Sequence, residues 1–173
     1  MPSRSATLHN RTKSPSFVGL TASSEQSSAI KRRNSKTETK PEIKLRRALW
    51  AAGLRYRKNV RRLSGVPDVV FVRSKVVVFC DGDFWHGRNW SDLQPKLRDG
   101  SNGAYWVEKI RSNMERDRVT TERLQREGWA VVRVWEKDVF TCLPQVVRSI
   151  ADLVVKRRPK NDGRVLVRPV KEL

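Results

Sequence analysis

Two aspartates lie at the ends of neighbouring predicted strands, where together they could hold a divalent cation. Asp68 follows a proline in GVPDVVF, and Asp81 ends the run VVVFCD thirteen positions later. Adjacent strands can bring two such carboxylates to one end of a sheet, where they would hold a metal ion against phosphate oxygens. Two carboxylates at such a short distance repel each other unless a cation lies between them. The pair therefore favours a metal site. Either residue alone would be read as a turn residue, since Asp is common at strand ends.

A histidine and a third acid could join this pair. His86 follows Asp81 by five positions, and an imidazole titrates near neutral pH, so it could take a proton from water or give one to a leaving oxygen. A lone histidine is more often a surface or packing residue, but its place in the same turn as Asp81 favours a site. Glu42, in the first predicted helix, could also approach the two aspartates. Its presence is explained equally well as a negative charge that complements the dipole at the helix N-terminus.

Aromatic side chains follow the same strand in a loop that is otherwise polar. The stretch FCDGDFWHGRNW, residues 79–90, contains Phe84, Trp85 and Trp90. A metal site does not require them. Aromatic residues in such a loop can be buried lids, or they can stack on bases or wedge between them. Composition leaves both interpretations open.

The charge of the chain points to a polyanionic partner. The 173 residues carry a formal net charge of +19 with a sequence pI near 11.0, and nucleic acid is the leading candidate. An anionic membrane surface would also attract this charge, but the sequence has no apolar run near 18 residues. Cys80 and Cys142 are too few for a disulfide framework or a four-cysteine zinc site, and they favour a reducing, cytosolic setting.

The pattern of apolar residues predicts the elements that position these groups. An amphipathic helix is expected to begin after Thr37 or Thr39 as N-cap and to end at Gly53, with Lys44, Arg46 and Arg47 on its polar face. Strands are expected at 67–72 and 75–80, joined by a turn at 73–74; the second is apolar at consecutive positions, as in a central strand covered on both faces. The remaining expected elements are a loop at 91–103, a long helix at 104–128, a strand at 129–136 and a helix at 144–158.

This order predicts an α/β domain with a mixed central sheet flanked by helices. The domain is expected to span 35–158. Residues 1–34 are rich in Ser and Thr and read as a disordered basic tail, although their scarcity of acids also permits a targeting peptide. Residues 159–173 read as a basic C-terminal extension.

Several separated motifs, in the same order, resemble the very short patch repair (Vsr) endonucleases of the PD-(D/E)XK nuclease superfamily. The resemblance covers residues 30–140 and rests on TKPEIKLRRALWAAGLRYRKNVRRLSGVPDVVFVRSKVVVFCDGDFWHG, PK, SNGAYWVEKIRSNMERDR and LQREGWAVVRVWE. It implies a restriction-endonuclease-like core. It also implies a strand-nicking DNA endonuclease, which in this family uses Mg²⁺, as one or two ions, and cuts beside a T·G mismatch left by deaminated 5-methylcytosine.

The resemblance also assigns a role to each candidate residue. Asp68 matches the metal-binding aspartate of the family, and Cys80 lies where the family offers a main-chain carbonyl to the metal. Asp81 occupies a position that would bind the metal or order its water, and His86 matches the catalytic histidine. Glu42 matches an acid on the first helix.

Further matches concern a supporting acid and the binding of DNA. Asp117 of NMERDR matches a supporting acid on the long helix. Phe84, Trp85 and Trp106 match aromatic residues that the family inserts into DNA beside the mismatch. We expect arginines, among them Arg46 and Arg88, to bind the flanking phosphates.

The sequence departs from the family at its structural zinc site. Where relatives carry GCFWHGC and a later cysteine, this chain has Asp83, Arg88, Trp90 and Lys137. Arginine, lysine and tryptophan are not zinc ligands, so no structural zinc is expected. The loop from Gly87 to Gly103 must therefore be held in another way.

The sequence thus leaves three functions open. The first is mismatch-directed nicking of duplex DNA, and the second is a Vsr-like nuclease of defence or mobile-element DNA processing without mismatch specificity. The third is a non-catalytic basic DNA-binding protein. In each case we expect the protein to be a monomer that binds double-stranded DNA. We expect it at the nucleoid in the bacterial cytoplasm, and mismatch-repair or methyltransferase-linked proteins are its candidate protein partners.

Overall fold

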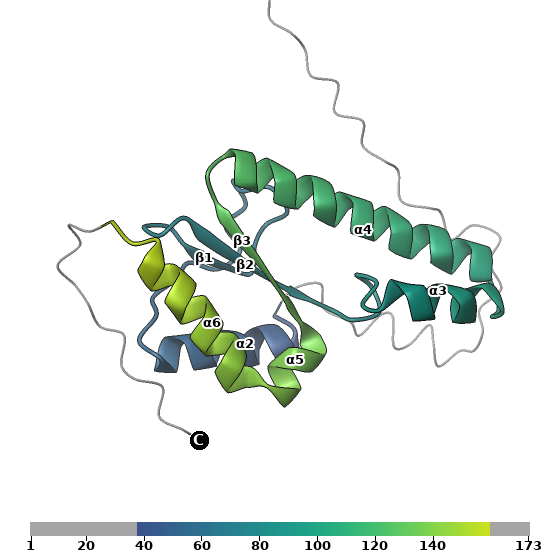
Figure 1. Cartoon of the computed structure of the whole chain (residues 1–173), viewed down its shortest axis with the longest axis horizontal. Helices are drawn as coiled ribbons and strands as arrows, with labels where there is room; N and C mark the ends of the chain where they lie inside the picture. Colours follow the sequence, from purple (N-terminus) through teal and green to yellow (C-terminus); the bar gives the residue numbers. More distant parts are fainter. Residues whose placement is uncertain (1–37, 160–173) are drawn as a thin grey trace, which may run out of the picture.

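The computed structural model describes residues 38–159, in which helices pack on both faces of a small sheet (Figure 1). The predicted tail at 1–34, the extension from residue 160 onward and Thr37 lie outside this part. In chain order the elements are α2 (Lys40–Ala51), β1 (Val69–Phe71), β2 (Val76–Asp81), α3 (Trp90–Arg98), α4 (Gly103–Arg126), β3 (Ala130–Trp135), α5 (Glu136–Thr141) and α6 (Leu143–Lys156). Among the described residues, no helix combines the length and the apolar character needed to cross a membrane.

The three strands form one mixed sheet in the order β1-β2-β3. β1 and β2 are antiparallel, with Val69 opposite Val78, while β2 and β3 are parallel. The parallel pair runs from Val76 opposite Ala130 to Asp81 opposite Trp135. The predicted mixed sheet is therefore confirmed, and β2 is its central strand.

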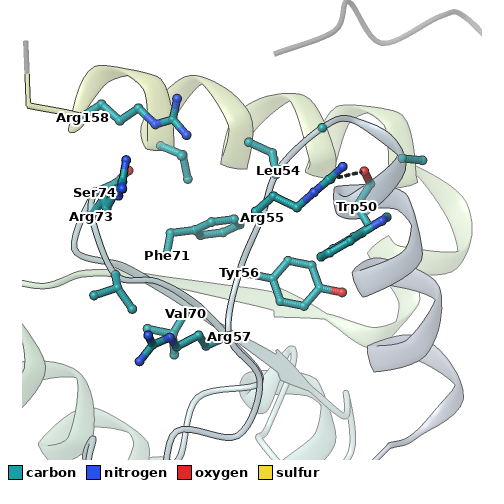
Figure 2. A pocket seen from close by; sticks show the side chains of 14 residues that line it. Trp50, Leu54, Arg55, Tyr56, Arg57, Val70, Phe71, Arg73, Ser74 and Arg158 are labelled. Carbon is teal, nitrogen blue, oxygen red and sulfur yellow. Dashed lines mark hydrogen bonds between the residues drawn. The ribbon is translucent and has the colours of Figure 1, made fainter. Parts of the chain in front are cut away.

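A short segment, residues 54–57, runs along the outer edge of β1 (Figure 2). Arg57 pairs with Val70 there: each backbone N–H donates to the other residue's carbonyl, at 2.9 and 2.8 Å. Beyond this one bridge the segment leaves the strand and turns toward the end of α2. The edge of β1 is thus covered at one residue pair only, which matters for a groove described below.

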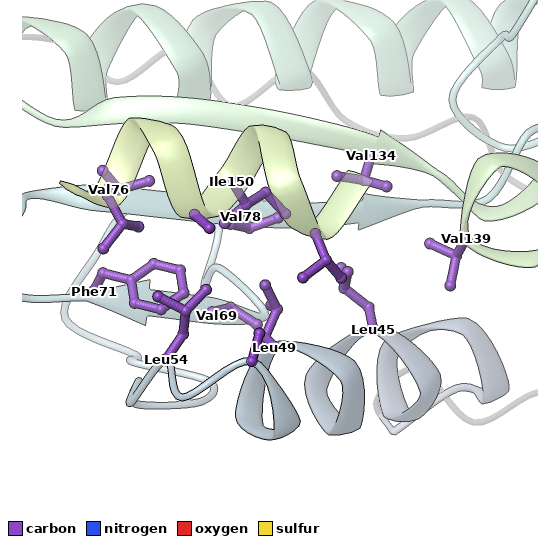
Figure 3. Packing of buried hydrophobic residues seen from close by; sticks show 14 residues of the cluster. Leu45, Leu49, Leu54, Val69, Phe71, Val76, Val78, Val134, Val139 and Ile150 are labelled. Carbon is purple, nitrogen blue, oxygen red and sulfur yellow. The ribbon is translucent and has the colours of Figure 1, made fainter. Parts of the chain in front are cut away.

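The successive valines of β2 are buried because both faces of the sheet are covered. Val76 and Val78 pack into the larger core, under α2, α5 and α6 (Figure 3). Val77 and Phe79 point to the opposite face and pack with Leu124 of α4. Complete burial of a valine side chain stabilises a fold by roughly 1.5–3 kcal/mol. Alternation along the strand places Asp81 on the α4 face, together with Val77 and Phe79.

The prediction of a loop over 91–103 is wrong, because residues 90–98 form α3. Pro95 lies inside this helix and removes one helical hydrogen bond, which is why the sequence read as a loop. Leu93 and Leu97, four residues apart, are half-buried on one side, and α3 packs against α4. Gly103 permits this approach, since a Cβ there would lie 2.4 Å from the Leu97 carbonyl oxygen. Tertiary packing therefore outweighs the cost of the proline.

Candidate active site

All six residues predicted from sequence to act in catalysis or metal binding line one pocket of about 280 Å³. They are Glu42, Asp68, Cys80, Asp81, His86 and Asp117. The pocket lies where β1 begins and β2 ends, because the antiparallel pairing of these strands brings those two points together. Asp68 and Asp81 therefore lie at the same end of the sheet and line the same pocket, as a shared metal site would need.

Asp68 sits just before β1, and the strand pairing holds its carboxylate in place. Its Oδ2 accepts a hydrogen bond from the Cys80 N–H at 2.8 Å. Burial raises the pKa of Asp68 to about 6; the nearby charges of Glu42 and Asp81 add to the rise, while the Cys80 amide and Arg46 oppose it. The ionised Asp68 is therefore costly to keep in this pocket, and a cation would relieve that cost.

The main chain of Cys80 offers a second oxygen beside Asp68. In an extended strand the N–H and C=O of one residue point to the same side, so the Cys80 carbonyl faces the side from which Asp68 accepts its hydrogen bond. The register of β1 ends at Val69 opposite Val78, so β1 does not pair with this carbonyl. Burial, followed by the charge of Asp68, raises the pKa of the Cys80 thiol to about 12, so the thiol remains protonated at neutral pH.

Asp81 is bound by an arginine that the sequence did not single out. Arg133 of β3 donates from Nε and Nη2 to the two oxygens of Asp81, at 2.5 and 2.8 Å, and its Nη2 lies 2.9 Å from Asp117 Oδ1. Only 4% of Asp81 is exposed, so this guanidinium partly neutralises a buried carboxylate. The signal was present in AVVRVW, where one arginine interrupts an apolar strand and therefore needs a partner.

His86 is oriented by the acid on α4. Its Nδ1 lies 2.6 Å from Asp117 Oδ2 and 3.6 Å from Asp81 Oδ1. Burial alone would lower the pKa of His86, but the hydrogen bond to Asp117 and the charges of Asp81 and Asp117 outweigh it and raise the pKa above its ordinary value. Because Nδ1 is engaged with Asp117, Nε2 is the nitrogen that can meet a substrate.

Glu42 lies at the pocket wall but is also hydrogen-bonded to the residues that precede its helix. Its oxygens accept hydrogen bonds from the Glu38 N–H and the Thr39 hydroxyl, both at 2.8 Å, and it pairs with Arg46 at 3.5 Å. Arg46 is 6% exposed, so the prediction that it lies on the polar face of the helix and meets phosphates there is wrong. It falls one turn after Glu42 on the buried side of α2, where its charge compensates that acid.

Three charged residues hold the loop that follows β2. Arg88 donates to Asp83 at 3.1 Å and to Asp138 of α5 at 2.8 Å, and the Lys137 N–H donates to Asp83 at 3.2 Å. We call Asp83, Arg88 and Asp138 the acid–arginine clasp. It ties residues 83–88 to the β3–α5 junction, while the rest of the segment from Gly87 to Gly103 is held by the packing of α3 on α4. Arg88 was predicted to bind DNA, but its guanidinium is engaged in this clasp.

The predicted aromatic residues gather into one partly exposed cluster. Ring centroids lie 5.2 Å apart for Phe84 and Trp85, 5.7 Å for Phe84 and Trp106, and 5.8 Å for Trp85 and Trp106. Phe84 and Trp85 are each 38% exposed, so two aromatic rings lie side by side at the surface. Asn113 of α4, which sequence reasoning missed, donates to the Trp85 carbonyl at 2.9 Å and anchors the cluster to the long helix.

The donor set suits a hydrated magnesium ion better than a metal held by side chains alone. Within residues 38–159, no group of three or more His, Cys, Asp and Glu side chains is arranged to hold a metal ion. Mg²⁺ needs no such cage, because it usually keeps several waters and binds through one or two carboxylates plus substrate phosphates. The Asp68 carboxylate and the Cys80 carbonyl supply two oxygens of this kind, whereas Asp81 is occupied by Arg133.

Comparison with known proteins identifies relatives that act on DNA. A family model described as DNA mismatch endonuclease Vsr matches residues 21–92. The type II nicking enzyme V.NmeDIP of Neisseria meningitidis serogroup C is 44% identical over 128 residues, which cover 72% of this chain and 85% of that protein.

Two further relatives carry related names. The type II nicking enzyme V.HpaIIP of Haemophilus parainfluenzae is 46% identical over 102 residues, covering 59% of this chain and 71% of the relative. The DNA mismatch endonuclease Vsr of Escherichia coli K12 is 38% identical over 100 residues, covering 57% and 62% respectively.

Proposed function

Because this chain belongs to the Vsr family of DNA endonucleases, and is itself a DNA-nicking endonuclease, we propose that it nicks duplex DNA at T·G mismatches with Mg²⁺ as its cofactor. We set aside the alternative of a non-catalytic DNA-binding protein, because the relatives of this chain are named nicking enzymes. The mismatch preference is supported by one observation above all. Phe84 and Trp85 of the aromatic cluster lie in the same loop as His86, directly after the strand that ends at Asp81.

The metal would be held by Asp68 and the Cys80 carbonyl. A bound Mg²⁺ would polarise an oxygen of the scissile phosphate and stabilise the charge that develops there. Asp68 has the charge and the position for this role, because its carboxylate is buried beside the charges of Glu42 and Asp81. Arg133 instead holds Asp81, which faces His86 across the pocket.

His86 would move the proton in phosphodiester hydrolysis. Water adds its oxygen to phosphorus, the P–O bond to one sugar breaks, and one proton passes from the water toward the leaving oxygen. His86 can take or give this proton at Nε2, since Asp117 fixes Nδ1. Arg133 holds Asp117 from the other side, so the imidazole keeps one orientation.

The aromatic cluster would recognise the distorted duplex. A mismatched pair is less costly to unstack than a matched one, and apolar side chains can wedge into such a step. Phe84 and Trp85 are exposed enough to do so, and the contacts with Trp106 and Asn113 hold them in a defined position.

A nicking assay on T·G and matched duplexes of otherwise identical sequence tests this proposal. With Mg²⁺ we expect faster nicking of the T·G duplex, and no nicking by Asp68→Ala or after chelation of the metal. Phe84→Ala/Trp85→Ala is expected to reduce the T·G preference more than it reduces cutting of a matched duplex. Equal cutting of both duplexes by the unaltered chain would reject the mismatch preference and favour a Vsr-like nuclease with another target.

A further inference from the structure

A large pocket lies away from the catalytic pocket and shares no lining residue with it. It measures about 800 Å³ and opens between the end of α2, the segment 54–57, the turn after β1 and the end of α6 (Figure 2). We call this the edge groove, defined by Trp50, Arg55, Tyr56, Arg57, Phe71 and Arg73. It forms because residues 54–56 diverge from the β1 edge beyond the single bridge at Arg57.

The edge groove is strongly positive. Arg55, Arg57, Arg73 and Arg158 line it, and the described residues of its wall include no acid. Arg55 and Arg57 are exposed. Guanidinium groups suit phosphate, because their fork of N–H donors can bind two of its oxygens at once. A wall with this composition favours a phosphodiester chain as its ligand.

Arg55 is held in place before any ligand arrives. Its Nη1 donates to the Trp50 carbonyl at 3.0 Å, and its guanidinium lies 3.9 Å from the centroid of the Trp50 ring. Tyr56 packs edge-on against the same ring at 6.0 Å. A side chain fixed by two contacts loses less conformational entropy on binding than a freely rotating arginine does. Arg55 is thus preorganised at the mouth of the groove.

A second hollow lies next to the edge groove along α2. It measures about 560 Å³, shares Trp50, Ala51 and Tyr56 with the edge groove, and is also lined by the exposed Arg47 and by the ion pair of Glu38 with Lys58. Its buried Arg46 pairs with Glu42 of the catalytic pocket. α2 runs along this path, and from Glu42 to Trp50 it rises roughly 12 Å. With α2 aligned along the duplex axis, as the proposal below requires, this length corresponds at 3.4 Å per base pair to roughly three to four base pairs of DNA.

We propose that the edge groove binds the phosphate backbone of the substrate DNA roughly three to four base pairs from the scissile phosphate. Arg55 and Arg57 bind the phosphates, and this binding carries no base preference. The inference rests on the DNA-nicking activity of the chain and not on its mismatch preference. It assigns a part of the molecule remote from the chemistry to the anchoring of one flank of the duplex.

The test measures DNA binding at several salt concentrations, without divalent metal, so that no strand is cut. For the full chain with Arg55→Ala/Arg57→Ala, we expect the plot of log affinity against log salt to become shallower by about 0.9 for each phosphate that is no longer neutralised, or about 1.8 for two. Arg55→Lys/Arg57→Lys keeps the charge and should retain most of the slope.

A charge-matched control and trimmed duplexes make the result specific. Arg126→Ala/Arg148→Ala removes two exposed arginines from other faces and should change the slope less. On a duplex trimmed to about two base pairs on the flank that the groove holds, the unaltered chain and the Arg55→Ala/Arg57→Ala variant should bind alike.

An unchanged slope in a variant whose thermal unfolding matches the unaltered chain would overturn the proposal. So would an equal effect of the control pair, or a defect that persists on duplexes trimmed on either flank. None of these measurements depends on T·G discrimination, so this inference can fail while the proposed mismatch preference stands, and the reverse.

Discussion

At the scale of single residues, the catalytic pocket contains buried carboxylates, which destabilise the fold when ionised, and an arginine, which compensates part of their charge. Asp68 carries a carboxylate whose pKa is raised to about 6 by burial and by neighbouring acids. Arg133 offsets the charge of Asp81 and of Asp117. The negative charges of Asp81 and Asp117 are therefore partly neutralised by Arg133, whereas the charge of Asp68 is not. A cation would bind beside Asp68.

Asp68→Asn should stabilise the metal-free protein. The folded protein holds the Asp68 proton more tightly than the unfolded chain does, so ionisation of Asp68 destabilises the fold as pH rises from about 3.8 to about 6. We expect the substitution to raise the free energy of unfolding by about 1–3 kcal/mol at pH 8 and by little near pH 4. Urea denaturation with chelator measures this. Asp152→Asn, an exposed acid on α6, is the control, and an equal gain there would count against this explanation.

Asp117→Asn should lower the pKa of His86. The hydrogen bond and the charge of Asp117 both raise that pKa against the effect of burial, so their removal leaves burial less opposed. The chain has only two histidines, which makes NMR titration of the His86 ring straightforward to assign. Glu115→Gln, on an exposed position of the same helix, should leave the titration in place. An unchanged pKa in Asp117→Asn would show that this hydrogen bond does not control the imidazole.

Arg133→Gln should destabilise the fold although it is not expected to touch the substrate. It leaves Asp81 buried without its bidentate partner, and removal of one member of a buried ion pair costs several kcal/mol. Because Arg133 is itself partly exposed, we expect a decrease of roughly 2–4 kcal/mol in the free energy of unfolding without metal. Arg126→Gln on α4 should cost far less, and a similar decrease in both variants would contradict the role given to Arg133.

At the scale of elements, the acid–arginine clasp positions the loop that carries Phe84 and Trp85 of the aromatic cluster. Arg88→Met should free this loop from α5, because both of its ion pairs are broken together. We expect faster backbone hydrogen exchange over residues 82–90 and a weaker T·G preference, with global stability reduced by only about 1 kcal/mol, since the pairs are partly exposed. Arg118→Met, which breaks exposed pairs on α4, is the comparison. Unchanged exchange over 82–90 would show that the clasp does not hold the loop.

Much of this arrangement follows from local pattern. The consecutive valines of β2 predict burial on both faces, and the strand ends at Asp68 and Asp81 predict one shared edge. The burial of Arg46 could also have been predicted, because residues 42, 45, 46 and 49 have helical spacing on one buried face. The basic residues Lys44, Arg46 and Arg47 made that side of α2 look polar instead. The helix at Pro95 could not be read in this way, because its stability comes from packing on α4.

At the scale of the whole molecule, positive charge is divided between the described domain and the ends of the chain. Residues 38–159 contain 26 Lys and Arg against 15 Asp and Glu, a net +11 of the total +19. A chain limited to these residues should still bind and nick DNA, but with a shallower salt dependence than the full chain. Binding and nicking assays over a salt series measure both properties. Identical slopes would mean that the remaining +8 does not contact phosphate.

The close backbone approach at Gly103 has a mechanical consequence. With no Cβ at position 103, the start of α4 lies directly against the backbone of α3 at Leu97 and Arg98. Trp106 lies on α4, one turn from this contact, while Phe84 and Trp85 follow β2. In the proposed mode of mismatch binding, a larger residue at position 103 would push α4 away from α3 and shift Trp106 relative to Phe84 and Trp85, while the lining of the catalytic pocket stays unchanged.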